Sequence, residues 1–194
     1  MIKYIPLLFE NPLLKDLPVN ILSEFLTHCK IKSFKSNKIV SDMSMADDNF
    51  YYILNGAVRG YYKYKGSQVN TFYFIKDDIF ANVEFMFLNS PGELHFETIA
   101  PSSIIIFSKE FLLKQAQKHP EIQFISFKYL AATIVSQEKR LRIMLRNDAK
   151  ERYLKFIELY GKYSNYLPLK EIAIFLDIAP ETLSRIRKEI ANSV

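Results

Sequence analysis

The residues best suited to specific chemistry lie near the end of the sequence, and that chemistry would be recognition of nucleic acid. They are Glu181, Thr182, Ser184, Arg185 and Lys188. Arg185 can donate two hydrogen bonds to O6 and N7 of guanine, and Glu181 can accept one from N4 of cytosine. We expect Thr182, Ser184 and Lys188 to contact phosphates, which fix the register of a protein on a duplex without reading its sequence.

Two short helices are expected to position this group. On the first helix Leu169, Ile172, Ala173 and Leu176 fall on one face. The turn would be 177–179, and Pro180 suits the first turn of the second helix because its missing N–H would be unpaired there. Two helices joined in this way are a common device for placing side chains in the major groove of DNA.

The second helix has two opposite faces at 100° per residue. Its apolar face comprises Leu183, Ile186 and Ile190. Its polar face, called the recognition face below, comprises Glu181, Ser184, Arg185 and Lys188. Two alternatives to DNA contact stay open. Glu181 and Arg185 can form an ion pair between positions i and i+4 on a solvated helix, worth about 0.2–0.5 kcal/mol, or the face can dock on a protein partner.

The region from Ile31 to Phe107 has the alternation and turn spacing of antiparallel strands. The expected strands are Phe50–Leu54, Val58–Tyr64, Asn70–Ile75, Phe96–Ala100 and Ser103–Phe107. Asn55-Gly56 predicts a type I′ hairpin, because that turn needs a positive φ at both central residues. A second reversal is expected at Lys65-Gly66. Many short antiparallel strands imply a sandwich or a barrel.

The flanking regions are expected to be helical. Short helical turns are predicted in residues 7–29, and helices over 109–119 and about 121–146. The long helix has an apolar stripe that either packs on the β domain or forms a two-helix dimer seam, and its length favours the seam. The stripe comprises Phe124, Phe127, Ala131, Ile134, Val135, Leu141 and Leu145, while Lys128, Lys139, Arg140 and Arg142 are expected in solvent. Asn147 would cap a further helix that ends near Gly161.

Composition and charge limit the function classes. The chain has 194 residues and a net charge of +5, but residues 147–194 contain eight basic and seven acidic residues, a net charge of +1. The case for DNA therefore depends on where the charges lie. No apolar run approaches the roughly 18 residues of a membrane span, and the start lacks a signal-peptide core, so we expect no membrane partner and a cytoplasmic location.

The sequence offers little support for catalysis or metal binding. Its single cysteine, Cys29, excludes an internal disulfide framework and a four-thiolate site, and is expected to be a small buried apolar residue. The three histidines have no partner at metal-ligand spacing. Phosphate-binding glycine loops, dinucleotide fingerprints and Ser-His-Asp patterns are absent from the sequence. We therefore expect no enzyme activity, no metal and no cofactor.

These motifs resemble those of the Crp/Fnr superfamily of bacterial transcription regulators over nearly the whole chain. The matching stretches are 50–59 (FYYILNGAVR), 171–173 (EIA) and 180–185 (PETLSR). The resemblance implies an α+β fold with an antiparallel β-roll related to cyclic-nucleotide-binding domains (1–119), a dimerisation helix (120–146) and a helix-turn-helix domain (147–194). It also implies that Glu181 and Arg185 contact bases, and that the partners are double-stranded DNA, a second copy of the chain and the transcription machinery. The β-roll would either sense a small-molecule effector or only support the dimer.

The sequence departs from the family pattern in the segment that binds the cyclic phosphate in relatives. Residues 80–88 (FANVEFMFL) and 94–98 (LHFET) lack the expected Arg-Ser or Arg-Thr pair. A buried phosphate would then lack its strongest counter-charge, so cyclic AMP is not expected to bind in the family manner. The residues of this segment that could line a pocket are Asn82, Glu84, His95 and Glu97. The aromatic interior of the β domain is either such a cavity or filled core.

Further departures affect the helix-turn-helix. Ala179 stands where relatives often have Ser or Thr, which removes a side-chain cap worth about 1 kcal/mol. Asp177 replaces the common glycine of the turn and tolerates positive φ less well than glycine. A different function class also remains, namely a cyclic-nucleotide- or other small-ligand-binding module whose C-terminal helices dock on a protein partner.

Overall fold

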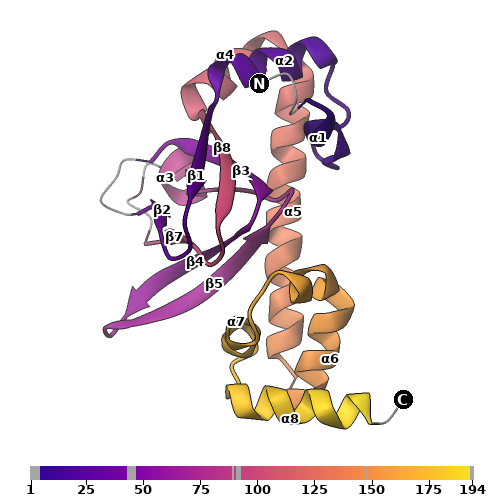
Figure 1. The fold of residues 1–194 in the computed structure, drawn as a ribbon. Coiled ribbons are helices and arrows are strands. Elements are labelled where there is room, and N and C mark those ends of the chain that lie inside the picture. The colour runs from indigo at the N-terminus through magenta and orange to yellow at the C-terminus, as the bar shows by residue number, and fades with distance from the viewer. Residues whose placement is uncertain (1–4, 43–46, 89, 91–92, 147, 193–194) are drawn as a thin grey trace. The chain divides into compact units, whose positions relative to one another are not determined.

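The computed structural model describes residues 5–42, 47–88, 90, 93–146 and 148–192. The chain divides into two compact units, Met1–Leu130 and Ala131–Val194. The boundary lies within the longest helix, α5 (Pro120–Met144), which is seen along its length in Figure 1. Among the described residues no helix is long and apolar enough to cross a membrane.

The first unit contains two four-stranded antiparallel sheets, which together form the β-roll. One sheet has the order β1-β8-β3-β6 and the other the order β2-β7-β4-β5. The strands are β1 (Lys30–Phe34), β2 (Ile39–Ser41), β3 (Asn49–Asn55), β4 (Ala57–Tyr64), β5 (Ser67–Ile75), β6 (Ile79–Ala81), β7 (His95–Thr98) and β8 (Ser102–Ser108). The α+β class and the antiparallel β-roll expected from the sequence are confirmed.

The turn at Asn55-Gly56 differs from the predicted type I′ hairpin. Only Gly56 has a positive φ (101°), and β3 and β4 belong to different sheets, so the turn leads the chain from one sheet to the other. A Cβ on Gly56 would lie 2.2 Å from Oγ of Ser102, and that hydroxyl also accepts a hydrogen bond from the Ala57 N–H (3.2 Å). The glycine is therefore needed for close packing as well as for its φ.

The type I′ dihedral signature occurs instead at Lys65-Gly66. Their φ values are 48° and 80°, and Tyr64 pairs with Ser67 across a two-residue loop. Positive φ at both central residues matches the right-handed twist of the flanking strands. The loop joins β4 and β5 into the long hairpin seen in Figure 1.

The interior of the β-roll is filled with aromatic rings. Phe80 stacks on Tyr51 (4.8 Å between ring centroids) and on Phe74 (5.1 Å), and contacts Phe96 (4.8 Å). Phe80 and Phe96 are completely buried. The region is thus packed core, as is usual for inward-facing aromatic residues on alternate strand positions.

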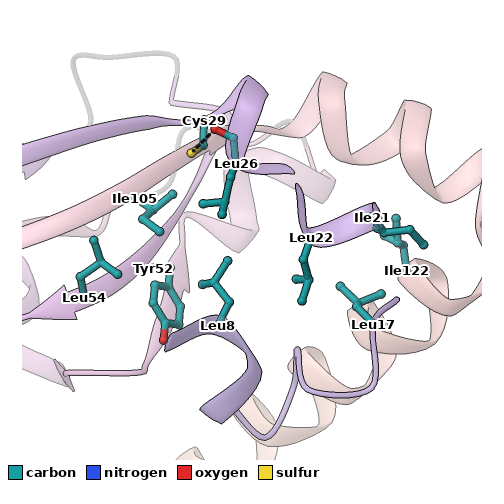
Figure 2. Packing of buried hydrophobic residues seen from close by; sticks show 10 residues of the cluster. All are labelled: Leu8, Leu17, Ile21, Leu22, Leu26, Cys29, Tyr52, Leu54, Ile105 and Ile122. Atoms are coloured by element: carbon teal, nitrogen blue, oxygen red, sulfur yellow. Dashed lines mark hydrogen bonds between the residues drawn. The ribbon is translucent and has the colours of Figure 1, made fainter. Parts of the chain in front are cut away.

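Helices cover the outer side of the sheet that contains β3 and β8. In the first unit they are α1 (Ile5–Glu10), α2 (Val19–His28), α3 (Val83–Leu88), α4 (Lys109–Lys118) and α5 as far as Leu130. Ser108 caps α4 by accepting a hydrogen bond from the N–H of Phe111. Leu8, Leu22 and Leu26 face the strand residues Tyr52 and Ile105 in a second apolar cluster (Figure 2).

The predicted apolar stripe of α5 is largely exposed. Phe127 and Ile134 each expose 69% of their surface, and Leu145, just beyond the helix, exposes 70%. Phe124, Ala131, Val135 and Leu141 are exposed as well. Most of these positions follow alternating steps of three and four residues, the spacing of a two-helix seam. Phe124 and Phe127, the stripe residues of the first unit, therefore do not pack on the β domain.

The second unit consists of helices around a small core. Besides the end of α5 they are α6 (Ala149–Tyr160), the 3₁₀-helix η2 (Gly161–Asn165), α7 (Leu169–Phe175) and α8 (Pro180–Ala191). The core side chains are Ile143, Phe156, Ile172, Ala173, Phe175, Leu176, Leu183 and Ile186. Asp148 caps α6 through the N–H of Lys150 (2.8 Å). Asn147, the cap predicted from the sequence, lies outside the described residues.

Candidate nucleic-acid interface

The turn between α7 and α8 has the geometry of a Schellman motif. The N–H of Ile178 donates to the carbonyl of Ala173 (3.0 Å), and the N–H of Asp177 donates to that of Ile174 (3.2 Å). Asp177 has φ +52°, the left-handed conformation that glycine usually supplies. The Asp for Gly replacement therefore leaves the turn intact, with the strain confined to one residue.

Two apolar side chains of α8, those of Leu183 and Ile186, pack the helix against the core of the second unit. Leu183 is completely buried and Ile186 almost so, while Ile190 is half-buried. Ala179 precedes the helix without a side-chain cap, and Pro180 takes the first helical position, both as predicted. This packing fixes the rotation of α8 about its axis and so determines which side chains are presented to solvent.

All four residues of the recognition face, Glu181, Ser184, Arg185 and Lys188, are exposed. Arg185 forms an ion pair with Glu189 (3.3 Å), not with Glu181 as the alternative interpretation supposed. Its side chain is still 71% exposed, and an exposed pair of this kind contributes only about 0.3–0.5 kcal/mol, so a base edge can replace Glu189 at small cost. Thr182 is half-buried at the border of the face.

The first helix of the motif differs in one respect from the sequence prediction. Leu169, which was expected in the core, is 41% exposed. Phe175, which was not expected there, is buried. Arg140 lies over the Phe175 ring, 5.1 Å from its centroid. The helix is only seven residues long, so its first residue lies at its end and gains little from the core.

Two further basic residues of α7 and α8, which the sequence analysis did not select, are also exposed. They are Lys170 on α7 and Arg187 on α8. Helical periodicity alone places Arg187 close to the apolar side, which is why it was overlooked. Its exposure shows that the long side chain extends beyond the packed edge.

The four candidate pocket residues of the β-roll have structural partners within the protein. Asn82 is buried, and its Oδ1 accepts a hydrogen bond from the N–H of Phe85 (3.2 Å) at the start of α3. Glu84 is exposed and accepts from Ser90. His95 is buried and stacks on Tyr61 (5.1 Å between centroids). Burial, with Lys63 nearby, lowers the pKa of His95.

Glu97 is held by an internal ion pair. Its Oε2 accepts from Nη2 (2.7 Å) and Nε (3.2 Å) of Arg59, and the side chains are only 14% and 16% exposed. Arg59 also donates to Asn70 (3.3 Å) and Gln68 (2.6 Å). Glu97 and His95 lie two residues apart on β7, opposite Arg59 and Tyr61 of β4, so they share one face of the sheet. Within the described ranges, no three His, Cys, Asp or Glu side chains gather as a metal ion would require.

Comparison with solved structures shows the same fold in bacterial regulators. FixK2 from Bradyrhizobium japonicum matches with a TM-score of 0.71 and 18% identity, covering 85% of each chain. The c-di-GMP responsive global regulator CLP from Xanthomonas campestris matches with a TM-score of 0.68 and 15% identity, covering 91% of this chain and 93% of that one. This chain has the Crp/Fnr regulator fold.

A third match supports the same conclusion. A CooA variant from Carboxydothermus hydrogenoformans has a TM-score of 0.69 and 14% identity, covering 88% of this chain and 79% of that one. No protein-family model and no well-characterised protein matches the sequence itself. At these identities the likeness shows the Crp/Fnr fold.

Proposed function

We propose that the protein is a sequence-specific DNA-binding transcription regulator that acts as a homodimer on an inverted repeat. The observation that carries the proposal is the exposed recognition face of α8, held in place by Leu183 and Ile186 and preceded by the Schellman turn. Arg185 would read guanine and Glu181 cytosine, while Thr182, Ser184 and Lys188 would contact phosphates. Transcription machinery would be a further partner.

The dimer is proposed from the exposed stripe of α5. Apolar side chains repeated at steps of three and four residues are typical of a helix that pairs with a copy of itself. A twofold dimer of helix-turn-helix units would contact half-sites about 34–36 Å apart, one turn of DNA. The division into a β-roll (1–119), a dimerisation helix (120–146) and a DNA-binding domain (147–194) is part of this proposal.

The seam can be tested with matched substitutions. Ile134→Glu introduces a charge at an exposed stripe position and is expected to give monomers in sedimentation equilibrium. Ala132→Glu introduces the same charge at an exposed position about 160° from Ile134 around the helix and is expected to leave the dimer intact. Equal dissociation of both variants, or a wild-type monomer, would contradict the seam.

DNA recognition is tested by selecting bound duplexes from a random pool and measuring the affinity of the selected site over a range of salt concentrations. Arg185→Ala is expected to relax preference at one base position, by about 1–3 kcal/mol. Lys188→Ala should weaken all sequences about equally and reduce the salt dependence. Lys35→Ala, an exposed lysine of the β-roll, is the charge-matched control and should change neither.

The outcomes separate the proposal from its alternative. If no sequence is enriched, the recognition face is better explained as a surface for a protein partner. If Arg185→Ala and Lys188→Ala reduce affinity identically on all sequences, the division between base and phosphate contacts is wrong.

We also propose that cyclic AMP does not bind in the β-roll in the family manner. The stacked rings of Tyr51, Phe74, Phe80 and Phe96 support this, because they occupy the interior. The engagement of Glu97 by Arg59 supports it too, because that guanidinium is already neutralised. Calorimetry showing micromolar affinity for cyclic AMP would contradict the proposal.

A further inference from the structure

A cavity lies outside the β-roll interior, between the helices and the outer side of the β3 and β8 sheet. Its volume is about 80 Å³. Leu22 and Leu26 of α2 form one wall, Tyr52 and Ile105 of the sheet a second, and Ile122 of α5 contributes to a third. Figure 2 shows these side chains around the space between α1, α2 and the strands. Every lining residue belongs to the first unit.

The polar groups around this cavity have partners in the protein. The Tyr52 hydroxyl donates to Oδ1 of Asp77 (2.8 Å), and the Ser126 hydroxyl donates to the carbonyl of Ile122 (3.0 Å). The Cys29 thiol donates to the carbonyl of Leu26 (3.3 Å), and burial raises its pKa, so it stays neutral. A charged or strongly polar occupant would lose its hydration without gaining hydrogen bonds from these groups.

We infer that this cavity binds a small, neutral, hydrocarbon-like molecule. Apolar cavities of this type stay free of water, and one of about 150 Å³ accommodates benzene. At about 80 Å³ the cavity is smaller, so the occupant is at most the size of a single ring. The exposed Phe87 of α3 lies among the lining residues, which gives the cavity a side open to solvent. This site is separate from the aromatic interior of the β-roll.

The cavity has a direct structural link to the proposed dimer helix. Ile122, Ile125 and Tyr129 line the cavity from one face of α5. Phe124 and Phe127 lie on roughly the opposite face and are exposed. A molecule in the cavity would therefore press on the helix that presents the seam. That the bound molecule acts as an effector rests on the proposed function as a DNA-binding regulator. The existence of the binding site does not depend on that function.

Xenon is a suitable first probe because it enters small apolar cavities without needing polar contacts. The protein, labelled with ¹³C at the isoleucine δ1 methyl groups and free of DNA, is titrated with xenon and followed by NMR. We expect saturable shifts at Ile79, Ile105, Ile122 and Ile125. Ile53 and Ile104 of the β-roll interior and Ile172 and Ile186 of the second unit are internal controls. Shifts confined to Ile53 and Ile104, or no saturable shift, would overturn the proposal.

Neighbouring residues of α4 provide a matched pair of variants. Leu112 lines the cavity, whereas Leu113 is half exposed to solvent. Leu112→Phe should fill the space and abolish the xenon shifts, and Leu113→Phe should preserve them. If both variants show the same xenon shifts while their spectra remain those of the folded protein, xenon does not bind in this cavity. Should Leu112→Phe fail to fold, the wild-type titration alone decides.

The effector role is tested on the full chain by repeating DNA selection and affinity measurements at the xenon pressure that saturates the methyl shifts. Allosteric coupling typically changes affinity by about 5- to 150-fold. Methyl shifts with an unchanged DNA affinity would overturn the effector role and leave the site in place. Methyl shifts in a protein that selects no DNA would leave the site in place and contradict the proposed function instead.

Discussion

Arg59 in the β-roll and Arg185 in the second unit each lie beside a glutamate, but their surroundings differ. The Arg59 to Glu97 distance is 2.7 Å, the side chains are 16% and 14% exposed, and Arg59 also donates to Asn70 and Gln68. Arg185 reaches Glu189 at 3.3 Å with 71% of its side chain exposed. The first guanidinium is used to join strands, whereas the second is available to a partner.

The comparison shows why polar residue types alone identify a binding site poorly. A long polar side chain placed between strands finds internal partners, because an unpaired buried polar group costs free energy. A side chain on the outer face of a two-helix motif has few internal partners within reach. The candidate residues of the β-roll therefore have internal partners, whereas those of the recognition face on α8 are exposed to solvent.

The sharpest test of this contrast is the aromatic interior of the β-roll. Phe80→Ala should lower the free energy of unfolding by about 3–5 kcal/mol, because the lost ring leaves a cavity in packed core. Tyr64→Ala, at an exposed aromatic residue on β4, should change it by less than about 1 kcal/mol. Urea denaturation measures both. If Phe80→Ala lowers the free energy of unfolding only slightly, the interior of the β-roll is a ligand cavity and not packed core.

The two ion pairs provide the next test. Glu97→Ala should cost toward the lower end of about 3–5 kcal/mol, because it leaves Arg59 largely buried without its carboxylate. Glu189→Ala removes the matching carboxylate from the exposed pair and should cost no more than about 0.5 kcal/mol. Equal losses in the free energy of unfolding would remove the distinction between a structural and an available arginine.

Local patterns predicted much of this architecture correctly. The alternation of apolar residues indicated the antiparallel strands, and the steps of three and four residues with Pro180 indicated α7 and α8. The recognition face followed because helical periodicity fixes which side chains oppose Leu183 and Ile186. In each case the signal and its consequence lie within one turn or one strand.

Features that depend on distant partners were missed. The turn at Asn55-Gly56 leads the chain from one sheet to the other, and Gly56 packs closely against Ser102, far along the chain. Asn82 accepts a hydrogen bond from the first turn of α3 and so caps that helix. Glu97 pairs with Arg59, which lies 38 residues away in sequence. Leu169 was placed in the core because periodicity does not show that a seven-residue helix has no packing at its first residue. Sequence spacing cannot supply these contacts.

Residues in the left-handed conformation allow a finer comparison between the units. Asp177→Gly should raise the free energy of unfolding by up to about 1 kcal/mol, because its φ of +52° strains any residue with a Cβ. Gly66→Ala should lower it by a similar amount, since nothing lies within 4 Å of the new Cβ and only the backbone is strained. Thermal denaturation measures both. A loss of stability for Asp177→Gly would show that the Asp177 side chain stabilises the turn.

The smallest expected effect concerns protonation of His95. Burial, with Lys63 nearby and partly offset by Asp42, lowers the pKa of His95 below its ordinary value of 6.5. The unfolded chain therefore binds this proton more readily, so the contribution to stability is fully present above pH 6.5 and is lost as the pH falls below it. NMR of the His95 ring should give a midpoint below that in urea, and His95→Gln should flatten the acid side of the stability profile. A midpoint at or above the value in urea would mean that His95 is solvated or paired with a carboxylate, and so available to a ligand as the recognition face is.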